Sequence, residues 1–454
     1  MGTPMTTLFG NSLPDMRIEP PGPESRRLAE NLAHNESPGV STMSTGHIPI
    51  VWTTARGANV IDADGNVYID LSGAFGVASI GHNNPKVRAA IRAQSRHLIH
   101  SLADVHPSNT RVQLAERLAT LAPVEDAQVM FANTGAEAVE LAMKTSSRWT
   151  GHHRFIAFEG AYHGVSYGAL AATHRHDFRE PYEPQLHQGV VHVPYPNPTH
   201  RPDRSLREWP EPVAQALAKG GIAGVLVEPV QGRGGEIVPP KGFLSELQKL
   251  CRIRKVLLIV DEMITGFGRT GRWFAVDHEN VRPDLICLGK AMGGGMPLSA
   301  CVGRREVMDS WRYKTGEAPH ASTFMDHPLS SSAALATLNE MERLDLPQRA
   351  NRLGRYTLKR LGALSKQCDH VLGTRGLGLM IGIELAIDSL AIADACLQRG
   401  VIVLGGGPKR NVLSLTPPIT ITQRQLNYAL MVIEETVRAD GQVSRPLAAA
   451  RDGR

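Results

Sequence analysis

Between residues 128 and 305, short apolar runs alternate with longer stretches whose apolar residues recur at helical spacing. The runs contain many aliphatic residues and end near glycine, proline or acidic residues, which is typical of buried strands. They read QVMFAN, RFIAFEG, GVVHVPY, GVLVEPV, VLLIVDE, DLICLGK and SACVGR. Strands that alternate with helices in this order predict an α/β fold with a mostly parallel sheet and crossover helices.

Two helices are predicted just before this region. The dipeptide Asn84-Pro85 opens the first helix, which we expect to run to about His97. The second helix covers residues 110–121, and helical spacing predicts one apolar face made of Val112, Ala115, Leu118 and Ala119.

The two ends of the chain differ from the middle. Residues 1–45 are rich in Pro, Ser, Thr and Gly without sustained periodicity, so we expect an N-terminal arm, disordered in part, with ordered elements beginning near Ile50. Residues 57–71 predict a β-hairpin, because two β-rich runs flank the turn signal Asp64-Gly65. Beyond residue 331, the runs GLGLMIGIEL, VIVLGG and NVLSLTPP among helical stretches indicate a smaller α+β domain.

These patterns predict a large domain and a small one. We expect the N-terminal part of the small domain at residues 46–85, the large domain at residues 86–330 and the C-terminal part of the small domain at residues 331–454. A chain of 454 residues with 42% hydrophobic residues is long enough to give such domains a substantial core.

Charge and cysteine content narrow the function classes. The net charge is +5, but acidic and basic residues are interleaved, so no block of like charge indicates nucleic-acid binding. No apolar run approaches the ~18 residues of a membrane span, and no signal-peptide pattern is evident. The five cysteines are scattered without a CxxC pair, and the histidines show no metal-ligand spacing. We therefore expect a soluble cytoplasmic protein that binds neither metal, membrane nor nucleic acid.

The stretch DLICLGKAMGGGMPL, residues 284–298, carries the first candidate for chemistry. Lys290 follows a predicted buried strand, and the glycines at 293–295 leave space and backbone freedom beside its amine for a bulky ligand. A lysine at the end of such a strand can lose its proton through desolvation and form a Schiff base with a carbonyl compound. The local pattern alone is equally compatible with a surface lysine in a loop.

The stretch ANTGAEAVE, residues 132–140, has the order strand, glycine turn, helix start. Free backbone amides and the positive end of the helix dipole meet at such a point, and the small residues Gly135 and Ala136 let a phosphate approach the backbone. Thr134 and Glu137 also match a capping box, which is the purely structural alternative.

Three further stretches hold candidate binding residues. Tyr162 in GAYHG follows a predicted strand, where an aromatic ring can form a wall against a flat ligand or pack as an ordinary loop tyrosine. Asp261 and Glu262 close the run VLLIVDE, and a carboxylate buried there needs a partner such as a protonated ring nitrogen or an arginine. Ser322 and Thr323 in HASTFMDHP offer hydroxyls to a phosphate oxygen or to a helix N-terminus.

Taken together and in their order along the chain, the motifs resemble those of the class III aminotransferases, which are pyridoxal-phosphate enzymes of fold type I. The resemblance extends from about Gly57 to Pro418, and the co-occurrence of the motifs is far more specific than any one of them. It implies a large domain with a mainly parallel seven-stranded sheet, a smaller α+β domain from both termini, and a homodimer with active sites at the interface. The cofactor that it implies is pyridoxal 5'-phosphate.

The resemblance also implies catalytic roles. Lys290 of LGKAMGGGMP would form the Schiff base with the cofactor and act as general base, and Asp261 of DEMITGFGRTG would keep the pyridine nitrogen protonated. The substrates implied are an amine or amino acid as donor and an aldehyde, ketone or keto acid as acceptor, which react in a ping-pong sequence.

Further cofactor contacts follow from the same resemblance. Gly135 and Ala136 would hold the phosphate, joined by Thr323 from the other subunit, and Tyr162 would stack on the ring. Ile264 stands where many family members carry a Gln near the ring, so a polar contact is absent there.

The substrate side departs from the family at two positions. Many members carry a Glu in a Q-G-E-(G/A)-G-like loop and an Arg three residues before a late Pro-Pro pair. These two residues accept a dicarboxylate or an ω-amine by changing partners. Here the corresponding residues are Arg233 in QGRGG and Ser414 in SLTPP. Arg233 is expected to bind a carboxylate bidentately or to remain a charge at the rim of the site. Phe75 falls where the family lines its substrate pocket.

Three functions are weighed on this basis. An aminotransferase is favoured by the retained cofactor motifs. The stretches NVLSLTPPITIT and DLSGAFGVASIG also resemble the racemase and epimerase branch of the family, so an amino acid racemase is the alternative, although Arg233 stands where those members use a second acid/base. A cofactor-free binding protein that keeps the fold is disfavoured, because the lysine, the aspartate and the phosphate motif are all present.

Overall fold

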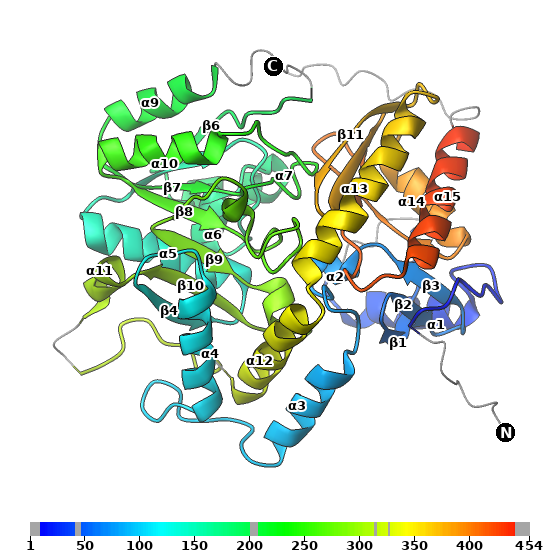
Figure 1. The fold of residues 1–454 in the computed structure, drawn as a ribbon, viewed down its shortest axis with the longest axis horizontal. Helices are drawn as coiled ribbons and strands as arrows, with labels where there is room; N and C mark the ends of the chain where they lie inside the picture. Colours follow the sequence, from blue (N-terminus) through cyan, green and yellow to red (C-terminus); the bar gives the residue numbers. More distant parts are fainter. Residues whose placement is uncertain (1–9, 41–46, 200–207, 313–315, 326, 441–454) are drawn as a thin grey trace. The chain divides into compact units, whose positions relative to one another are not determined.

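The computed structural model describes residues 10–40, 47–199, 208–312, 316–325 and 327–440 (Figure 1). The chain divides into two compact units. Unit 1 consists of Met1–Asn84, Lys359–Thr374 and Ile383–Arg454, and unit 2 consists of Pro85–Leu358 and Arg375–Gly382.

Unit 2 is built on a seven-stranded sheet. Its strands are β4 (Ala127–Ala132), β5 (Arg154–Phe158), β6 (Val190–Val193), β7 (Ile222–Val227), β8 (Leu257–Asp261), β9 (Leu285–Leu288) and β10 (Ser299–Arg304). The order across the sheet is β4-β10-β9-β8-β7-β5-β6, and neighbours are parallel except that β10 runs antiparallel to β4 and β9. The predicted α/β fold with a mainly parallel seven-stranded sheet is confirmed.

Unit 2 also contains helices, some of which connect these strands. They are α3 (Pro85–Ser95), α4 (Asn109–Leu121), α5 (Gly135–Thr150), α6 (Tyr167–Ala172), α7 (His176–Arg179), η2 (Glu180–Gln185), α9 (Pro210–Ala218), α10 (Phe243–Arg254), η3 (Ala275–His278), η4 (Lys290–Gly293), α11 (Arg305–Met308), η5 (Asp309–Trp311), α12 (Pro328–Arg343) and α13 (Leu346–Ser365), which continues into unit 1. In the described part of the chain, no helix is both long and apolar enough to cross a membrane.

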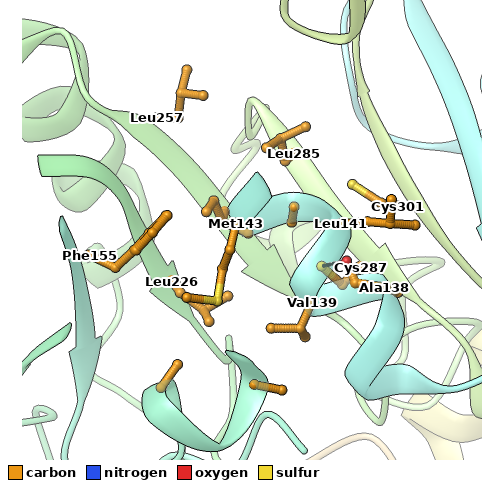
Figure 2. Close-up of a cluster of buried hydrophobic side chains, with 14 of the residues drawn as sticks. Ala138, Val139, Leu141, Met143, Phe155, Leu226, Leu257, Leu285, Cys287 and Cys301 are labelled. Carbon is orange, nitrogen blue, oxygen red and sulfur yellow. Dashed lines mark hydrogen bonds between the residues drawn. The ribbon is translucent and has the colours of Figure 1, made fainter. Parts of the chain in front are cut away.

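A buried apolar cluster fixes α5 against the sheet (Figure 2). Ala138 and Leu141 of the helix belong to this cluster together with Leu226 of β7 and Cys287 of β9. Burial of a side chain such as Leu141 stabilises the fold by roughly 1.5–3 kcal/mol. Because α5 begins only a two-residue turn after β4, this packing holds the helix N-terminus at the carboxyl end of β4.

The buried face of α4 differs from the predicted one. Leu114 and Leu118 are fully buried, whereas Val112 is 55% exposed. The helix packs against α12 and β4, and these contacts bury the side that carries Leu114 and Leu118. Both faces of the helix carry apolar residues, so spacing alone did not distinguish them.

Unit 1 combines segments from both ends of the chain. One sheet has the order β1-β2-β3-β13 and the other β11-β12-β15-β14. The elements are α1 (Pro23–Asn35), η1 (Pro38–Val40), β1 (Trp52–Arg56), β2 (Asn59–Asp62), β3 (Val67–Asp70), α2 (Gly73–Gly76), β11 (Val371–Leu377), β12 (Met380–Leu385), α14 (Ser389–Gln398), β13 (Val401–Ile402), β14 (Leu404–Gly406), β15 (Val412–Leu415) and α15 (Gln423–Asp440). The end of β11, the start of β12 and the turn between them, Arg375–Gly382, are grouped with unit 2. The predicted hairpin around Asp64-Gly65 is confirmed by the antiparallel pair β2–β3.

Helix α1 shows that the expected start of ordered structure near Ile50 is wrong. The backbone amides of Glu24 and Ser25, in its first turn, donate to the two carboxylate oxygens of Asp64 at 2.8 and 2.9 Å. The acceptor of these orphan helix amides therefore comes from the β2–β3 turn, far along the chain, and the local sequence does not reveal it. Residues 1–9 and 41–45 of the predicted arm lie outside the described residues.

Candidate active site

The carboxyl edge of the unit 2 sheet collects most of the predicted functional residues. Asp261 ends β8, Lys290 follows β9, Gly135 follows β4 and Tyr162 follows β5. These four strands share one direction, since β10 is antiparallel to both β4 and β9 and the others pair in parallel. Ligands of open α/β sheets bind at this edge.

Lys290 is partly buried and has an unusual backbone. Its φ of 44° lies in the left-handed region, which is uncommon for a residue with a side chain and frequent at functional sites. Burial lowers the pKa of its amine, and the nearby charge of Arg233 adds to this effect, whereas Asp261 and Glu228 oppose it. A lysine with a lowered pKa is more readily present as the neutral amine, which is the nucleophilic and basic form.

The glycines after Lys290 have two different roles. A Cβ on Gly295 would meet nothing within 4 Å, as expected for space beside the amine. Gly294 has a φ of 59°, and a Cβ there would collide with the hydroxyl of Thr337 on α12. The expectation of open space is therefore wrong for Gly294, which is needed for a close approach between η4 and α12.

Asp261 pairs with a histidine that the sequence reading did not single out. The carboxylate is buried, with Oδ1 accepting a hydrogen bond from the Met263 amide at 3.0 Å and Oδ2 lying 2.8 Å from Nδ1 of His163. His163 is itself buried, and its backbone amide donates to Thr173 Oγ1 at 2.8 Å. The only sequence signal for His163 is its place directly after Tyr162, at the end of a strand.

The N-terminus of α5 is capped and still leaves two amides available. Thr134 Oγ1 accepts from the Glu137 amide at 3.2 Å, and the Glu137 carboxylate accepts from the amides of Asn133 and Thr134, so the predicted capping box is present. Among the hydrogen bonds of the described residues, the amides of Gly135 and Ala136 have no acceptor. The cap and an anion site therefore use different donors of the same helix end.

Glu228, a second residue missed from the sequence, connects Tyr162 to the loop of Arg233. It follows β7 and is buried, which raises the pKa of its carboxyl group. Its Oε1 accepts from the Tyr162 amide at 2.9 Å and its Oε2 from the Gly232 amide at 3.0 Å. The buried carboxyl group of Glu228 thus positions both Tyr162 and the turn that carries Arg233.

Arg233 and Ile264 lie next to these groups. The guanidinium carbon of Arg233 lies 4.7 Å from the centre of the Tyr162 ring. A Cβ on Gly232 would stand 3.5 Å from Cγ2 of Ile264, so the isoleucine borders the turn that presents Arg233.

Thr323 lies in a segment close to the N-terminus of α5. The neighbouring Ser322 hydroxyl accepts a hydrogen bond of 3.3 Å from the side-chain amide of Asn133. Thr323 itself is exposed and makes no hydrogen bond with the described residues of its own chain.

Phe75 and Ser414 belong to unit 1. Phe75 is 60% exposed and has a φ of 59° in the one-turn helix α2. Asp70 fixes this turn, because its Oδ1 accepts from the Ser72 amide at 2.7 Å and its Oδ2 lies 2.7 Å from Nε2 of His82. Ser414 is partly buried in β15, opposite Leu404 of β14.

The donor set of unit 2 fits pyridoxal 5'-phosphate. The cofactor carries an anionic phosphate, a flat ring with a basic nitrogen and a carbonyl carbon that a lysine can bind. The free amides of Gly135 and Ala136, the buried carboxylate of Asp261 and the amine of Lys290 match these three parts, and all lie at one edge of the sheet. The half-buried ring of Tyr162 supplies an aromatic face.

Comparisons with known proteins agree with this fit. The family model described as Aminotransferase class-III matches residues 40–437. The chain is 38% identical to the acetylornithine aminotransferase of Methanopyrus kandleri over 87% of its own length and 95% of that protein. It is 32% identical to the alanine/serine racemase of Pyrococcus horikoshii over 95% of its own length and 94% of that protein. The structure of the ornithine aminotransferase from Toxoplasma gondii, which has partial occupancy of PLP at its active site, matches with a TM-score of 0.79 at 30% identity, covering 88% of this chain and 92% of that one.

Proposed function

The chain belongs to the class III aminotransferase family, and from this premise we propose how its own residues carry out the reaction. It is a pyridoxal-phosphate-dependent aminotransferase that moves an amino group between an amine or amino acid and a carbonyl compound. The observation that carries the assignment of roles is that Lys290, Asp261 and the free amides at the N-terminus of α5 lie at the same edge of the sheet.

Lys290 is the residue that holds the cofactor and moves the proton. When bound, pyridoxal phosphate withdraws electrons from the carbon that bears the substrate's amino group. Lys290 would hold the cofactor through its Nζ atom, and the same amine would serve as the general base for the proton on the substrate carbon. The lowered pKa of this amine suits it to both tasks.

Asp261 and His163 act at the ring nitrogen. The Asp261 carboxylate holds a proton on that nitrogen, and the 2.8 Å contact with His163 orients the carboxylate. His163 is therefore a positioning residue, which acts on the cofactor through Asp261. Tyr162 would cover one face of the ring, and Ile264 would border the ring without offering a polar contact.

The phosphate is held by Gly135 and Ala136 of one subunit and by Thr323 of the other. This proposal is supported by the two amides without an acceptor and by the exposure of Thr323.

The same proposal requires a homodimer. Five large apolar side chains in two neighbouring segments are 40–61% exposed, namely Leu98, Ile99, Leu102, Val105 and Phe324. The two segments contact each other, since the rings of His100 and Phe324 are 5.5 Å apart. Exposed apolar groups gathered in this way suit burial against a second copy of the chain, which would also bring Thr323 to its partner's site.

A cytoplasmic location is proposed on the basis of the cysteines. All five, Cys251, Cys287, Cys301, Cys368 and Cys396, are buried free thiols. Unpaired thiols of this kind are common where the compartment is reducing.

Amino acid racemisation is the second candidate, because one relative is named a racemase. Exchange of a proton on both faces of the substrate carbon needs a second acid/base besides Lys290. A guanidinium such as that of Arg233 stays protonated and cannot accept a proton.

A panel of amino donors and carbonyl acceptors tests the function. We expect the cofactor's visible absorbance to disappear with a donor and to return with an acceptor. Incubation of one enantiomer without any keto acid separates the candidates: loss of chiral purity under these conditions would establish racemisation instead.

A further inference from the structure

Arg233 stands at the tip of a turn whose backbone is fixed. Gln231 and Ile237, on either side, exchange two backbone hydrogen bonds of 3.0 Å. Within the turn, the Gly232 amide donates to the buried carboxyl group of Glu228. Arg233 is therefore presented from a defined position, although its side chain is exposed.

The guanidinium of Arg233 rests on aromatic rings and has no anionic partner among the described residues. Its central carbon lies 4.7 Å from the centre of the Tyr162 ring and 6.0 Å from that of Phe178. No ion pair or hydrogen bond of this guanidinium with the described part of the chain is found. Stacking on a ring face leaves the N–H edge of a guanidinium free for a planar acceptor.

A second arginine on the same ring provides the contrast. The guanidinium carbon of Arg175 lies 4.7 Å from the centre of the Phe178 ring, on which Arg233 also rests. Both carboxylate oxygens of Asp177 accept hydrogen bonds from Arg175, so its charge is already compensated. Of these two neighbouring cations, Arg233 is the one with a free donor edge.

The surroundings of Arg233 connect it to the reacting amine. Ile264 and Met380 lie within 3.6 Å of the place where a Cβ on Gly232 would stand, so apolar groups border the turn. Tyr162, on whose ring Arg233 rests, follows β5 at the same carboxyl edge of the sheet as Lys290, and the charge of Arg233 is among those that act on the Lys290 amine. A molecule that reaches Lys290 therefore meets an uncompensated cation beside apolar groups.

We propose that Arg233 binds a carboxylate that the substrate carries besides its reacting amino or carbonyl group, so that this enzyme selects anionic substrates. This inference rests on the proposed function, because it takes Lys290 as the reacting amine. A bidentate guanidinium–carboxylate pair is planar and charge-assisted, and the free edge of Arg233 offers that geometry. A diamine would place its second ammonium group against a cation that cannot lose its charge.

Binding of unreactive probes to the loaded enzyme isolates this step from the reaction. Butyrate and butyramide have nearly the same shape, and only the first is charged. We expect isothermal titration calorimetry to give a much tighter Kd for butyrate than for butyramide with the wild-type enzyme. In Arg233→Gln, the Kd for butyrate should increase about 10- to 100-fold, the range of a hydrogen bond to a charged group, while the Kd for butyramide stays unchanged.

Two further variants sharpen the comparison. Arg233→Lys keeps the charge without the fork of donors, so it should give an intermediate Kd for butyrate. Arg175→Gln removes the neighbouring arginine that Asp177 compensates, and it should bind butyrate like the wild type.

The outcomes separate this inference from the proposed function. Two results with Arg233→Gln would overturn the carboxylate site. The first is an equal loss of affinity for butyrate and butyramide, because Arg233 would then only support the Tyr162 ring. The second is an unchanged affinity for butyrate. If the wild-type cofactor absorbance responds to no amine while butyrate binding still depends on Arg233, the carboxylate site stands and the proposed reaction fails.

Discussion

His163 Nδ1 lies 2.8 Å from Oδ2 of Asp261, and both side chains are almost completely shielded from solvent. The other oxygen of the carboxylate is held by the Met263 amide. A buried carboxylate with two fixed partners has one orientation, which is what a group that must hold a proton on a cofactor nitrogen requires. The histidine contributes this orientation from the loop after β5, a strand that β7 separates from β8 in the sheet.

Replacement of His163 by Gln tests this contribution. We expect kcat to fall about 10- to 100-fold with little change in KM, because a hydrogen bond to a charged group contributes roughly 1.5–3 kcal/mol. The pH dependence of the cofactor's visible spectrum should also move, since the proton at the ring nitrogen is held less firmly. His176→Gln is the matched control, because this histidine is exposed and its side chain faces Glu180, away from Asp261's partners described above. An unchanged pH dependence in His163→Gln would assign the residue a purely structural role.

Glu262 makes stability depend on pH. Its side chain is fully buried, and burial raises its pKa from 4.5 to about 7 in spite of hydrogen bonds from Thr265 and the Val276 amide. The folded state therefore holds this proton more tightly than the unfolded state does. The contribution of Glu262 to the free energy of unfolding thus decreases as pH rises from 4.5 to 7 and is constant above.

Glu262→Gln removes this titration. Relative to wild type, the free energy of unfolding of the variant should rise by roughly 3 kcal/mol across that window, as measured by denaturant unfolding at several pH values. Exposed Glu246 on α10 provides the control variant Glu246→Gln, whose difference from wild type should not vary in this way. If the free energies of unfolding of Glu262→Gln and wild type differ by the same amount at every pH, the raised pKa is not that of Glu262.

The exposed apolar segment around Leu102 predicts a subunit interface. A charge placed there by Leu102→Glu should weaken the dimer, because an unpaired charge in an apolar interface is costly. Sedimentation velocity should show a shift from dimer toward monomer, together with weaker cofactor binding through the loss of the partner's Thr323. Ile253→Glu alters a residue that is 75% exposed on α10, outside this segment, and should leave the dimer intact. If both variants dissociate to the same extent, or neither does, the segment around Leu102 is not the subunit interface.

Most of the fold is predictable because its signals are local. Each buried strand of the unit 2 sheet carries its own apolar run, and each crossover helix its own periodicity, so the seven strands of the sheet follow from short windows of sequence. Contacts between distant segments leave no such signal. The first turn of α1 is completed by Asp64 from the hairpin, and the buried side of α4 is chosen by α12 and β4.

The same distinction applies to the site. Lys290, Asp261 and Gly135 each stand at or shortly after the end of a strand in a recognisable motif, so the sequence points to them. His163 and Glu228 act through partners that are 98 and 66 residues away, Asp261 and Tyr162 respectively. No spacing rule connects residues so far apart, and only the parallel strands that carry them bring these pairs together.

The identity of the cofactor-binding lysine is the central claim and can be measured directly. The purified enzyme is treated with borohydride, which reduces the bond between lysine and cofactor to a stable one, and is then digested and mapped by mass spectrometry. We predict that the pyridoxyl group is found on the peptide containing Lys290 and that Lys290→Ala carries none. A pyridoxyl group on another lysine, or a reduced wild-type enzyme without one, would contradict the account.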